Sequence, residues 1–151
     1  MRYAAPLAAC ALLALGVAGC TRGPAPVSVT LPDAASSPAC AAAAAAWPGT
    51  VSGMSSRTTT VDSPAARAWG DPAVIAICGY PPLSPTTADC LAVDGVDWVV
   101  QPRSDGMQFT AYGRTPTLDV LVPSAYSPES LLLPAFSAAA RALPDNGRHC
   151  S

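Results

Sequence analysis

Lysine is absent from this chain, so every fixed positive side-chain charge is carried by arginine. The absence of lysine excludes a Ser-Lys hydrolytic mechanism. The chain also contains no Gly-x-Ser-x-Gly segment, which argues against the nucleophile of an α/β-hydrolase. It contains no Cys-x-x-Cys segment, which argues against a thioredoxin-like redox site. These absences remove the common nucleophilic and redox enzymes from consideration.

Charge and metal-binding residues are equally sparse. Charged residues make up 12% of the chain and the formal net charge is -2. Without a basic face, nucleic acid is not an expected partner, and no polybasic segment is present to bind anionic lipid. The one histidine, His149, lies in the tail, where few packed neighbours would orient it as a base. The cysteine spacings are wide and irregular, which argues against zinc, and we expect no cofactor.

The first residues predict an export signal. Arg2 supplies a positive start and residues 8–18 form an uncharged apolar segment, so residues 1–19 are typical of a signal peptide. The segment is too short and too rich in alanine for a membrane-spanning helix. Val17-Ala18-Gly19-Cys20 resembles a lipobox, in which the cysteine sulfur is lipidated before cleavage. A second match ending at Cys10 follows too short an apolar segment.

Lipidation of Cys20 would place the mature protein on the extracytoplasmic face of the cell membrane. Each buried CH₂ contributes about 0.8 kcal/mol, and two acyl chains give stable anchoring. Residues 20–26 form the lipidated cysteine and a short tether, and residues 21–26 extend over roughly 20 Å at most. A plain cleaved signal and an uncleaved signal anchor remain the alternatives.

Four cysteines remain in the predicted domain, and their even number in an exported protein predicts two disulfides. They are Cys40, Cys78, Cys90 and Cys150. Four cysteines allow three pairings. We favour Cys40–Cys78 with Cys90–Cys150, because each bond closes a long loop. Cys78–Cys90 with Cys40–Cys150 is the nearest alternative.

Residues 27–151 predict a single α+β domain, stapled by disulfides, with a mainly antiparallel sheet of five or six strands and two main helices packed on one face. Ser37-Pro38 predicts the start of a helix over residues 39–47. Ser127-Pro128 predicts the start of the final helix, which Pro134 should kink or delay. Ser63-Pro64 predicts a helical turn or two up to Trp69. Strands are expected at residues 27–31, 57–61, 73–78, 90–100, 107–112 and 117–122.

Candidate contact residues lie in the loops between these elements. The proline-rich loop of residues 79–89 presents Tyr80, and loops on a rigid scaffold often carry function. Arg114 could bind an anion, but we expect it to pair with a carboxylate such as Asp97 or Asp119 and to fix its turn. Asp97 and Asp94 are three residues apart, which places them on opposite faces of an extended strand. The tryptophans, Trp47, Trp69 and Trp98, are expected as core anchors.

A set of short motifs resembles a known family. Trp69-Gly70-Asp71-Pro72, Cys78-Gly79, the run from Val93 to Trp98, and Gly113-Arg114-Thr115-Pro116 occur in that order. Together they resemble an uncharacterised actinobacterial family of exported and lipid-anchored proteins, domain of unknown function 3515. The resemblance implies a compartment and a shared fold. It implies no catalytic residue.

We therefore expect a lipid-anchored, non-enzymatic domain that binds or scaffolds an envelope protein or ligand. An envelope hydrolase that uses carboxylates would require two close aspartates with raised pKa values. A small-molecule carrier would require a large apolar cavity.

Overall fold

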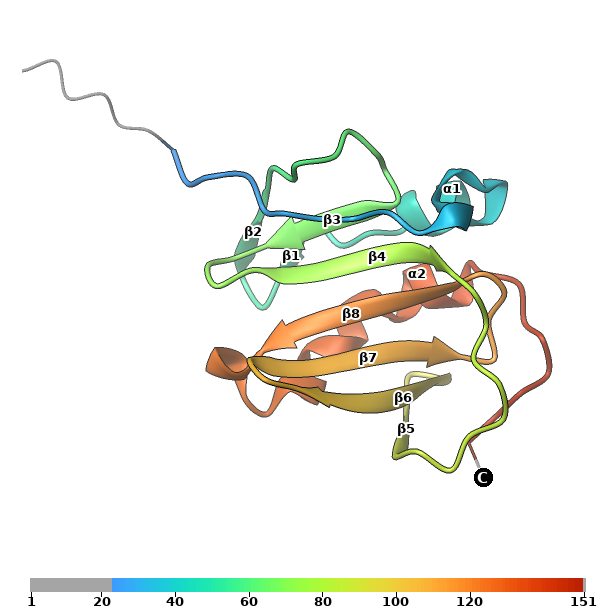
Figure 1. The fold of residues 1–151 in the computed structure, drawn as a ribbon. Coiled ribbons are helices and arrows are strands. Elements are labelled where there is room, and N and C mark those ends of the chain that lie inside the picture. The colour runs from blue at the N-terminus through green and yellow to red at the C-terminus, as the bar shows by residue number, and fades with distance from the viewer. Residues whose placement is uncertain (1–22, 151) are drawn as a thin grey trace, which may run out of the picture.

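The computed structural model of this protein describes residues 23–150, which form one sheet of eight antiparallel strands (Figure 1). The predicted signal and Cys20 lie outside the described residues. The strands stand in the order β1-β2-β3-β4-β8-β7-β6-β5. Their bounds are β1 (Thr50–Val51), β2 (Met54–Arg57), β3 (Ala66–Trp69), β4 (Val74–Tyr80), β5 (Cys90–Val93), β6 (Val96–Arg103), β7 (Gly106–Tyr112) and β8 (Thr117–Pro123).

The predicted count of five or six strands is wrong, because the sheet has eight. Two additional strands, β1 and β2, form a hairpin whose turn residues Ser52 and Gly53 have φ values of 48° and 79°. The segment predicted as one extended stretch over residues 90–100 divides into β5 and β6 at Asp94 and Gly95. Both of these residues also have positive φ, as a two-residue hairpin turn requires. The α+β class with disulfides is confirmed.

Strand β3 replaces the helical turn predicted after Ser63-Pro64. Ser63 Oγ accepts a hydrogen bond from the Ala65 amide at 3.3 Å, as a cap would, but the chain then extends. It pairs with β2 on one side and with β4 on the other. Because Ala66, Ala68 and Trp69 are all buried, packing on both faces overrides the helical preference of alanine.

Two predicted strands at residues 27–31 and 57–61 are mostly absent from the sheet. Only Arg57 of the second segment belongs to a strand, at the end of β2. The two segments nevertheless meet, because Val27 forms an isolated parallel bridge with Thr59.

The predicted helices are present but shorter than expected. Helix α1 (Pro38–Ala44) begins where Ser37 Oγ accepts a hydrogen bond from the Cys40 amide at 3.2 Å. The final helix starts late, as Pro134 predicts. A 3-10 helix, η3 (Glu129–Phe136), contains Pro134 and leads into α2 (Ser137–Arg141). Two further 3-10 helices are η1 (Asp33–Ser36) and η2 (Ser124–Tyr126).

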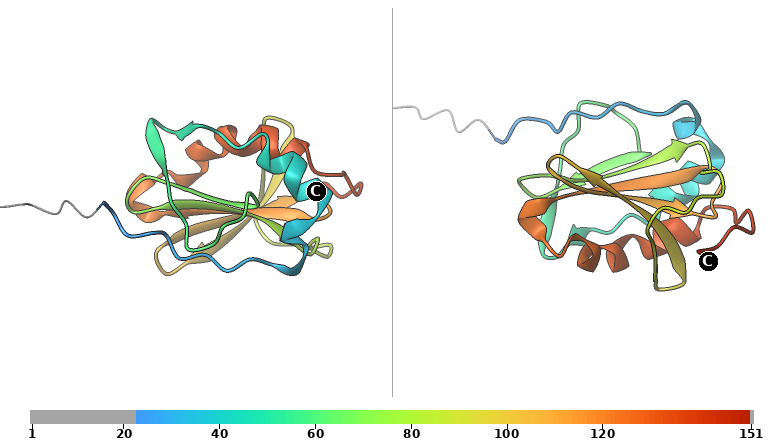
Figure 2. Two further views of the ribbon diagram at one scale, coloured as in Figure 1. Left: turned by 90° about the horizontal axis from the view of Figure 1, so that it is seen from above. Right: turned by 60° about the horizontal axis from the view of Figure 1, so that its bottom comes forward.

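The helices α1 and α2 lie on one face of the sheet and contact each other (Figure 2). Their buried residues join a core with the strand residues that face them, including Leu118, Val120 and Val122, which the sequence predicts as core. On the opposite face the N-terminal segment packs Val29 against Ala66 and Ile77. It then turns through η1 around the end of β4 to reach α1.

Both disulfides form in the favoured pairing. Cys40 of α1 is bonded to Cys78 of β4, and Cys90 of β5 is bonded to Cys150 of the tail. The disulfide prediction is therefore confirmed, and the second bond holds the C-terminal segment against the sheet. Among residues 23–150, no helix is long and apolar enough to cross a membrane.

Candidate functional site

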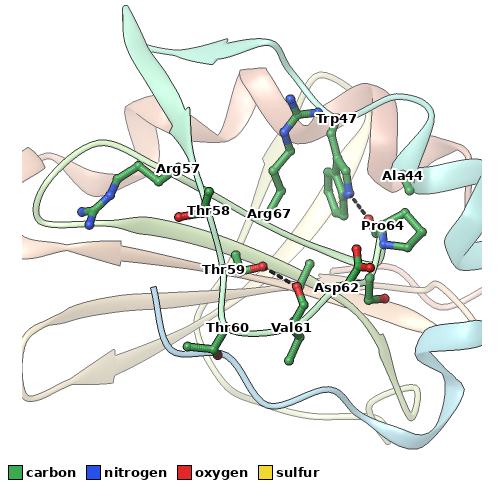
Figure 3. Close-up of a pocket in the computed structure, with 12 residues that line it drawn as sticks. Ala44, Trp47, Arg57, Thr58, Thr59, Thr60, Val61, Asp62, Pro64 and Arg67 are labelled. Carbon is green, nitrogen blue, oxygen red and sulfur yellow. Dashed lines mark hydrogen bonds between the residues drawn. The ribbon is translucent and has the colours of Figure 1, made fainter. Parts of the chain in front are cut away.

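A cleft of about 690 Å³ lies beside β3 (Figure 3). It is lined by residues 57–64, which run from β2 toward β3, and by Ala66 and Arg67 of β3. Ala44, at the end of α1, and Trp47, which follows this helix, complete the lining. We call this hollow the Arg67 cleft and residues 58–64 the threonine loop. Strand β2 pairs with β3 only as far back as Ala68, so the threonine loop separates from the edge of β3 and leaves this space.

The N-terminal segment holds the threonine loop from outside. The Val27 amide donates to Thr58 O at 2.9 Å, and the Thr60 amide donates to Val27 O at 2.9 Å. Two residues further on, the Val29 amide donates to Thr60 Oγ1 at 3.0 Å. Within the loop, Thr59 Oγ1 donates to Val61 O at 2.8 Å. The loop is therefore a positioned wall of the cleft.

Trp47 lines the cleft, and Trp69 is buried in the core next to it on β3. Trp47 Nε1 donates to Pro64 O at 2.9 Å, and Trp69 Nε1 donates to Pro48 O at 3.1 Å. Trp69 also meets Phe136 edge to face, with ring centroids 5.4 Å apart. All three tryptophans, including Trp98, are buried, so they are core anchors as predicted. Among the described buried polar atoms, Trp98 Nε1 lacks a hydrogen-bond partner.

The two arginines of the cleft differ in how they are used. Arg57 is fully engaged: its guanidinium donates to Gly70 O and Ala25 O and lies 3.3 Å from Asp71 Oδ1. Arg67 is half-buried and makes no hydrogen bond or ion pair within residues 23–150. Its guanidinium carbon lies 6.0 Å from the Trp69 ring centroid, and its side chain extends alongside Trp47 (Figure 3). Arg67 is therefore the free cation of the cleft within the described chain.

One carboxylate also lines the cleft. Asp62 belongs to the threonine loop and is exposed, and it accepts no hydrogen bond from any described residue. Because an exposed charge is strongly screened by solvent, Asp62 offsets little of the charge of Arg67. The local geometry therefore favours an anionic ligand near Arg67.

The predicted contact residues Tyr80, Arg114 and Asp97 do not form one surface. Tyr80 ends β4 and is half-buried on the face away from the helices, where it lines a smaller cavity of about 150 Å³ with Asp119. Burial, followed by the charge of Asp119, raises the pKa of Tyr80 above 10.0. The proline loop itself is mostly exposed, and Arg148 Nη1 donates to Leu83 O.

The predicted pair of Asp97 and Arg114 is wrong. Arg114 instead donates to Leu143 O at 3.2 Å and lies 3.7 Å from Asp145 Oδ2. A hydrogen bond from the Gly147 amide, and then the charge of Arg114, lowers the pKa of the exposed Asp145 carboxyl. Arg114 thus fixes its turn, as expected, but against the chain that follows α2.

Asp97 faces the C-terminal tail. Its Oδ2 accepts a hydrogen bond from the Cys150 amide at 2.9 Å and lies 3.4 Å from His149 Nδ1. Asp94 lies in the hairpin turn with a φ of 49°, so the two aspartates have separate structural positions. His149 is exposed in this tail, and the described contacts give it no nucleophile to activate.

Asp119 is the buried carboxyl that the sequence analysis did not single out as a site. It lies in the middle of β8 and is 6% exposed. Thr110 Oγ1 donates to Oδ1 at 2.6 Å and Gln108 Nε2 donates to Oδ2 at 2.7 Å. Burial raises the pKa of Asp119 above 3.8, although these two hydrogen bonds act in the opposite direction. No second carboxylate lines its cavity within residues 23–150, and the described residues contain no metal-binding cluster.

The family comparison agrees with the motifs. A family model described as "Protein of unknown function (DUF3515)" matches residues 4–146. The chain belongs to this family. No curated protein and no solved structure shows significant similarity to the chain. The family therefore supplies a relationship without an activity.

Arg67 was missed because the sequence analysis placed residues 65–69 in a helical turn. The structure shows that this segment is a strand in which buried residues, mostly alanines, flank the single half-buried residue Arg67. A charged residue inside such a strand could have identified it as a candidate.

Proposed function

We propose that this protein is a lipoprotein anchored through Cys20 to the extracytoplasmic face of the cell membrane, of an actinobacterial type, and that its domain is a non-enzymatic binding module of the cell envelope. The lipobox supports the anchor, since small residues precede Cys20 and an apolar segment precedes them. The two disulfides support an oxidising compartment outside the cytoplasm.

The observation that carries the binding function is the free guanidinium of Arg67 in a 690 Å³ cleft. The guanidinium is half-buried against the Trp69 ring, and its N–H groups make no hydrogen bond within residues 23–150. Such a group gains most when a ligand supplies the missing hydrogen bonds and opposite charge. The Trp69 ring, whose centroid lies 6.0 Å from the guanidinium carbon, packs against this side chain.

The two alternatives fit the described residues less well. A carrier of apolar small molecules needs an apolar enclosure, whereas this cleft has a mixed polar and apolar lining and is open to solvent. A carboxylate hydrolase needs a second acidic group near Asp119, where the lining offers Tyr80, Gln108 and Thr110.

Substitution of Cys20 tests the anchor. The wild-type protein should partition with membranes, and its intact mass should show a chain that begins at Cys20 and carries a diacylglyceryl group. Cys20→Ser should remove the lipid and prevent this processing. Cys10→Ser is the matched control and should leave partition and mass unchanged.

Two results would contradict the anchor. Recovery of an unlipidated wild-type chain from the soluble fraction would favour plain secretion. Retention of residues 1–19 in both wild type and Cys20→Ser, with both in the membrane, would favour an uncleaved signal anchor.

A further inference from the structure

The Arg67 guanidinium has the chemistry of an oxyanion site. It presents a planar set of N–H donors, which matches the oxygens of a phosphate or carboxylate. One face of the side chain is used by the ring of Trp69, at 6.0 Å from its centroid, while its donors make no bond within the described chain. In the same cleft, Arg57 is already held by Gly70, Ala25 and Asp71. Arg67 is thus the group left for a ligand.

The threonine loop adds a neutral hydroxyl group to the same cleft. The hydroxyls of Thr59 and Thr60 are engaged with Val61 and Val29. The hydroxyl of Thr58, which also lines the cleft, makes no hydrogen bond within residues 23–150. The cleft therefore holds two donor groups without a described partner, the Arg67 guanidinium and the Thr58 hydroxyl.

The N-terminal segment fixes how far the cleft can be from the anchor. Ala25 O accepts a hydrogen bond from Arg57 Nη2 at 2.8 Å, and Val27 is bonded to both Thr58 and Thr60. Arg57 and the threonine loop line the cleft. The five peptide units from Cys20 to Ala25 can extend to about 17 Å at most. If Cys20 is acylated, as the proposed function holds, the cleft therefore lies close to the lipid headgroups.

From these contacts we infer that the Arg67 cleft binds the phosphate of an anionic lipid headgroup in the membrane that carries the protein. The inference rests on the proposed anchor, which supplies the proximity. It requires no polybasic surface, because a single headgroup occupies a single site, and the sequence contains no polybasic segment. Asp62 lowers the affinity only slightly, because it is an exposed carboxylate at the same cleft.

The test uses the full mature lipoprotein loaded into lipid nanodiscs. One set contains phosphatidylcholine alone, and a second set also contains phosphatidylglycerol. The readout is the nuclear magnetic resonance signal of the Trp47 indole N–H, because this group is bonded to Pro64 O in the wall of the cleft. The signal should shift progressively as the phosphatidylglycerol content rises, and it should remain constant in phosphatidylcholine.

Matched variants assign the effect to Arg67. Arg67→Gln should abolish the shift, and Arg67→Lys should weaken binding about tenfold because the ammonium lacks the planar donor set. Arg103→Gln is the control, since Arg103 is an exposed arginine on β6 and makes no ion pair within residues 23–150. Asp62→Asn should tighten binding roughly threefold by removing an exposed negative charge. It leaves every described hydrogen bond intact, so it remains informative if an Arg67 variant misfolds.

The outcomes separate the two proposals. Failure of the wild-type protein to load into discs would refute the anchor before any headgroup is tested. A loaded protein whose Trp47 signal does not respond to phosphatidylglycerol, or responds equally in Arg67→Gln, would overturn the headgroup inference alone. A response to inorganic phosphate in phosphatidylcholine discs, without a response to phosphatidylglycerol, would assign the cleft to a soluble anion and would also overturn it.

Discussion

Arg67 and Asp119 are two charged side chains with contrasting surroundings. Arg67 faces an open cleft and has no partner among the described residues, whereas Asp119 is buried and accepts hydrogen bonds from Thr110 and Gln108. The first arrangement leaves bonding capacity for a ligand. The second satisfies the carboxyl internally, so its main consequence is for stability.

Substitution of Asp119 should change how stability depends on pH. Its pKa is raised above the ordinary value of 3.8, so the folded protein holds this proton more tightly than the unfolded chain. Stability from this group is therefore largest at low pH and falls as pH rises through the folded pKa. Asp119→Asn should remove this fall and increase stability at neutral pH, since the Gln108 amide can turn to accept a hydrogen bond.

Urea unfolding of both proteins from about pH 4 to about pH 8 measures this difference. Asp89→Asn, at an exposed carboxyl, controls for the loss of one charge. Parallel curves for wild type and Asp119→Asn would show that the burial of Asp119 has no energetic consequence.

A methyl group at Gly79 should destabilise the fold. Gly79 has a φ of 119°, and a Cβ there would overlap the backbone of Ala34 and Ala35 in η1. Gly79→Ala should cost about 1–3 kcal/mol of unfolding free energy. Gly49→Ala is the control, because a Cβ at Gly49 would meet no atom within 4 Å. Equal midpoints of chemical unfolding for the two variants would argue against close packing of η1 on β4.

At the scale of elements, hydrogen bonds and the two disulfides hold the irregular segments of the chain, namely the threonine loop and the C-terminal tail, against the sheet. The loop has no regular structure of its own, but backbone bonds to Val27 hold it on one side. The disulfide of Cys40 and Cys78 lies in the core, since both residues are fully buried. The disulfide of Cys90 and Cys150 is only half-buried and holds the tail.

Removal of the two disulfides should have unequal effects. In the chain-entropy relation, the sequence separations of 38 and 60 residues favour the Cys90–Cys150 bond by only about 0.4 kcal/mol. The Cys40→Ala, Cys78→Ala double variant also loses buried sulfur packing, which outweighs this difference. Both double variants should lose roughly 2–5 kcal/mol, with the larger loss for the buried pair. Chemical unfolding measures the losses, and a larger loss for the Cys90 and Cys150 variant would refute this order.

The elements that the sequence predicts well carry strong local signals. The serine and proline that start α1, the apolar run of β4, and the alternation in β8 all act through neighbouring residues. Strand β3 and the β1–β2 hairpin were missed because their pairing depends on distant partners: Ala66 pairs with Ile77, and β1 is only two residues long. The Arg67 cleft depends on these same elements, so it could not be found before β3 was known to be a strand.

At the scale of the whole molecule, the short tether between the proposed anchor and the domain would keep the Arg67 cleft close to the membrane surface. Val27 contacts the threonine loop, so the chain that leaves the domain toward Cys20 starts beside the Arg67 cleft. On the proposed anchor, lipids of the same membrane are presented to the cleft at a high effective concentration.

Lengthening the tether should therefore weaken headgroup binding without changing the site. Insertion of a flexible Gly-Ser segment of about 20 residues before Ala25 should reduce the effective concentration roughly tenfold. The Trp47 signal in phosphatidylglycerol discs should then need a higher lipid fraction for the same shift. Binding of a soluble short-chain phosphatidylglycerol should be equal in both proteins, and an unchanged disc titration would contradict the role of the tether.

The order of the strands also divides the sheet into two halves, which meet where β4 pairs with β8. Strands β1 to β4 form one meander and strands β5 to β8 form another, and they are joined in the sheet by the β4–β8 ladder. Each disulfide stays within one meander, and the connecting loop of residues 81–89 is mostly exposed. Because no disulfide joins the two meanders, a protease that cuts this loop would break the covalent connection between them. Two separately oxidised fragments would remain, associated through the ladder and the shared core, and able to reassemble as a complementing pair.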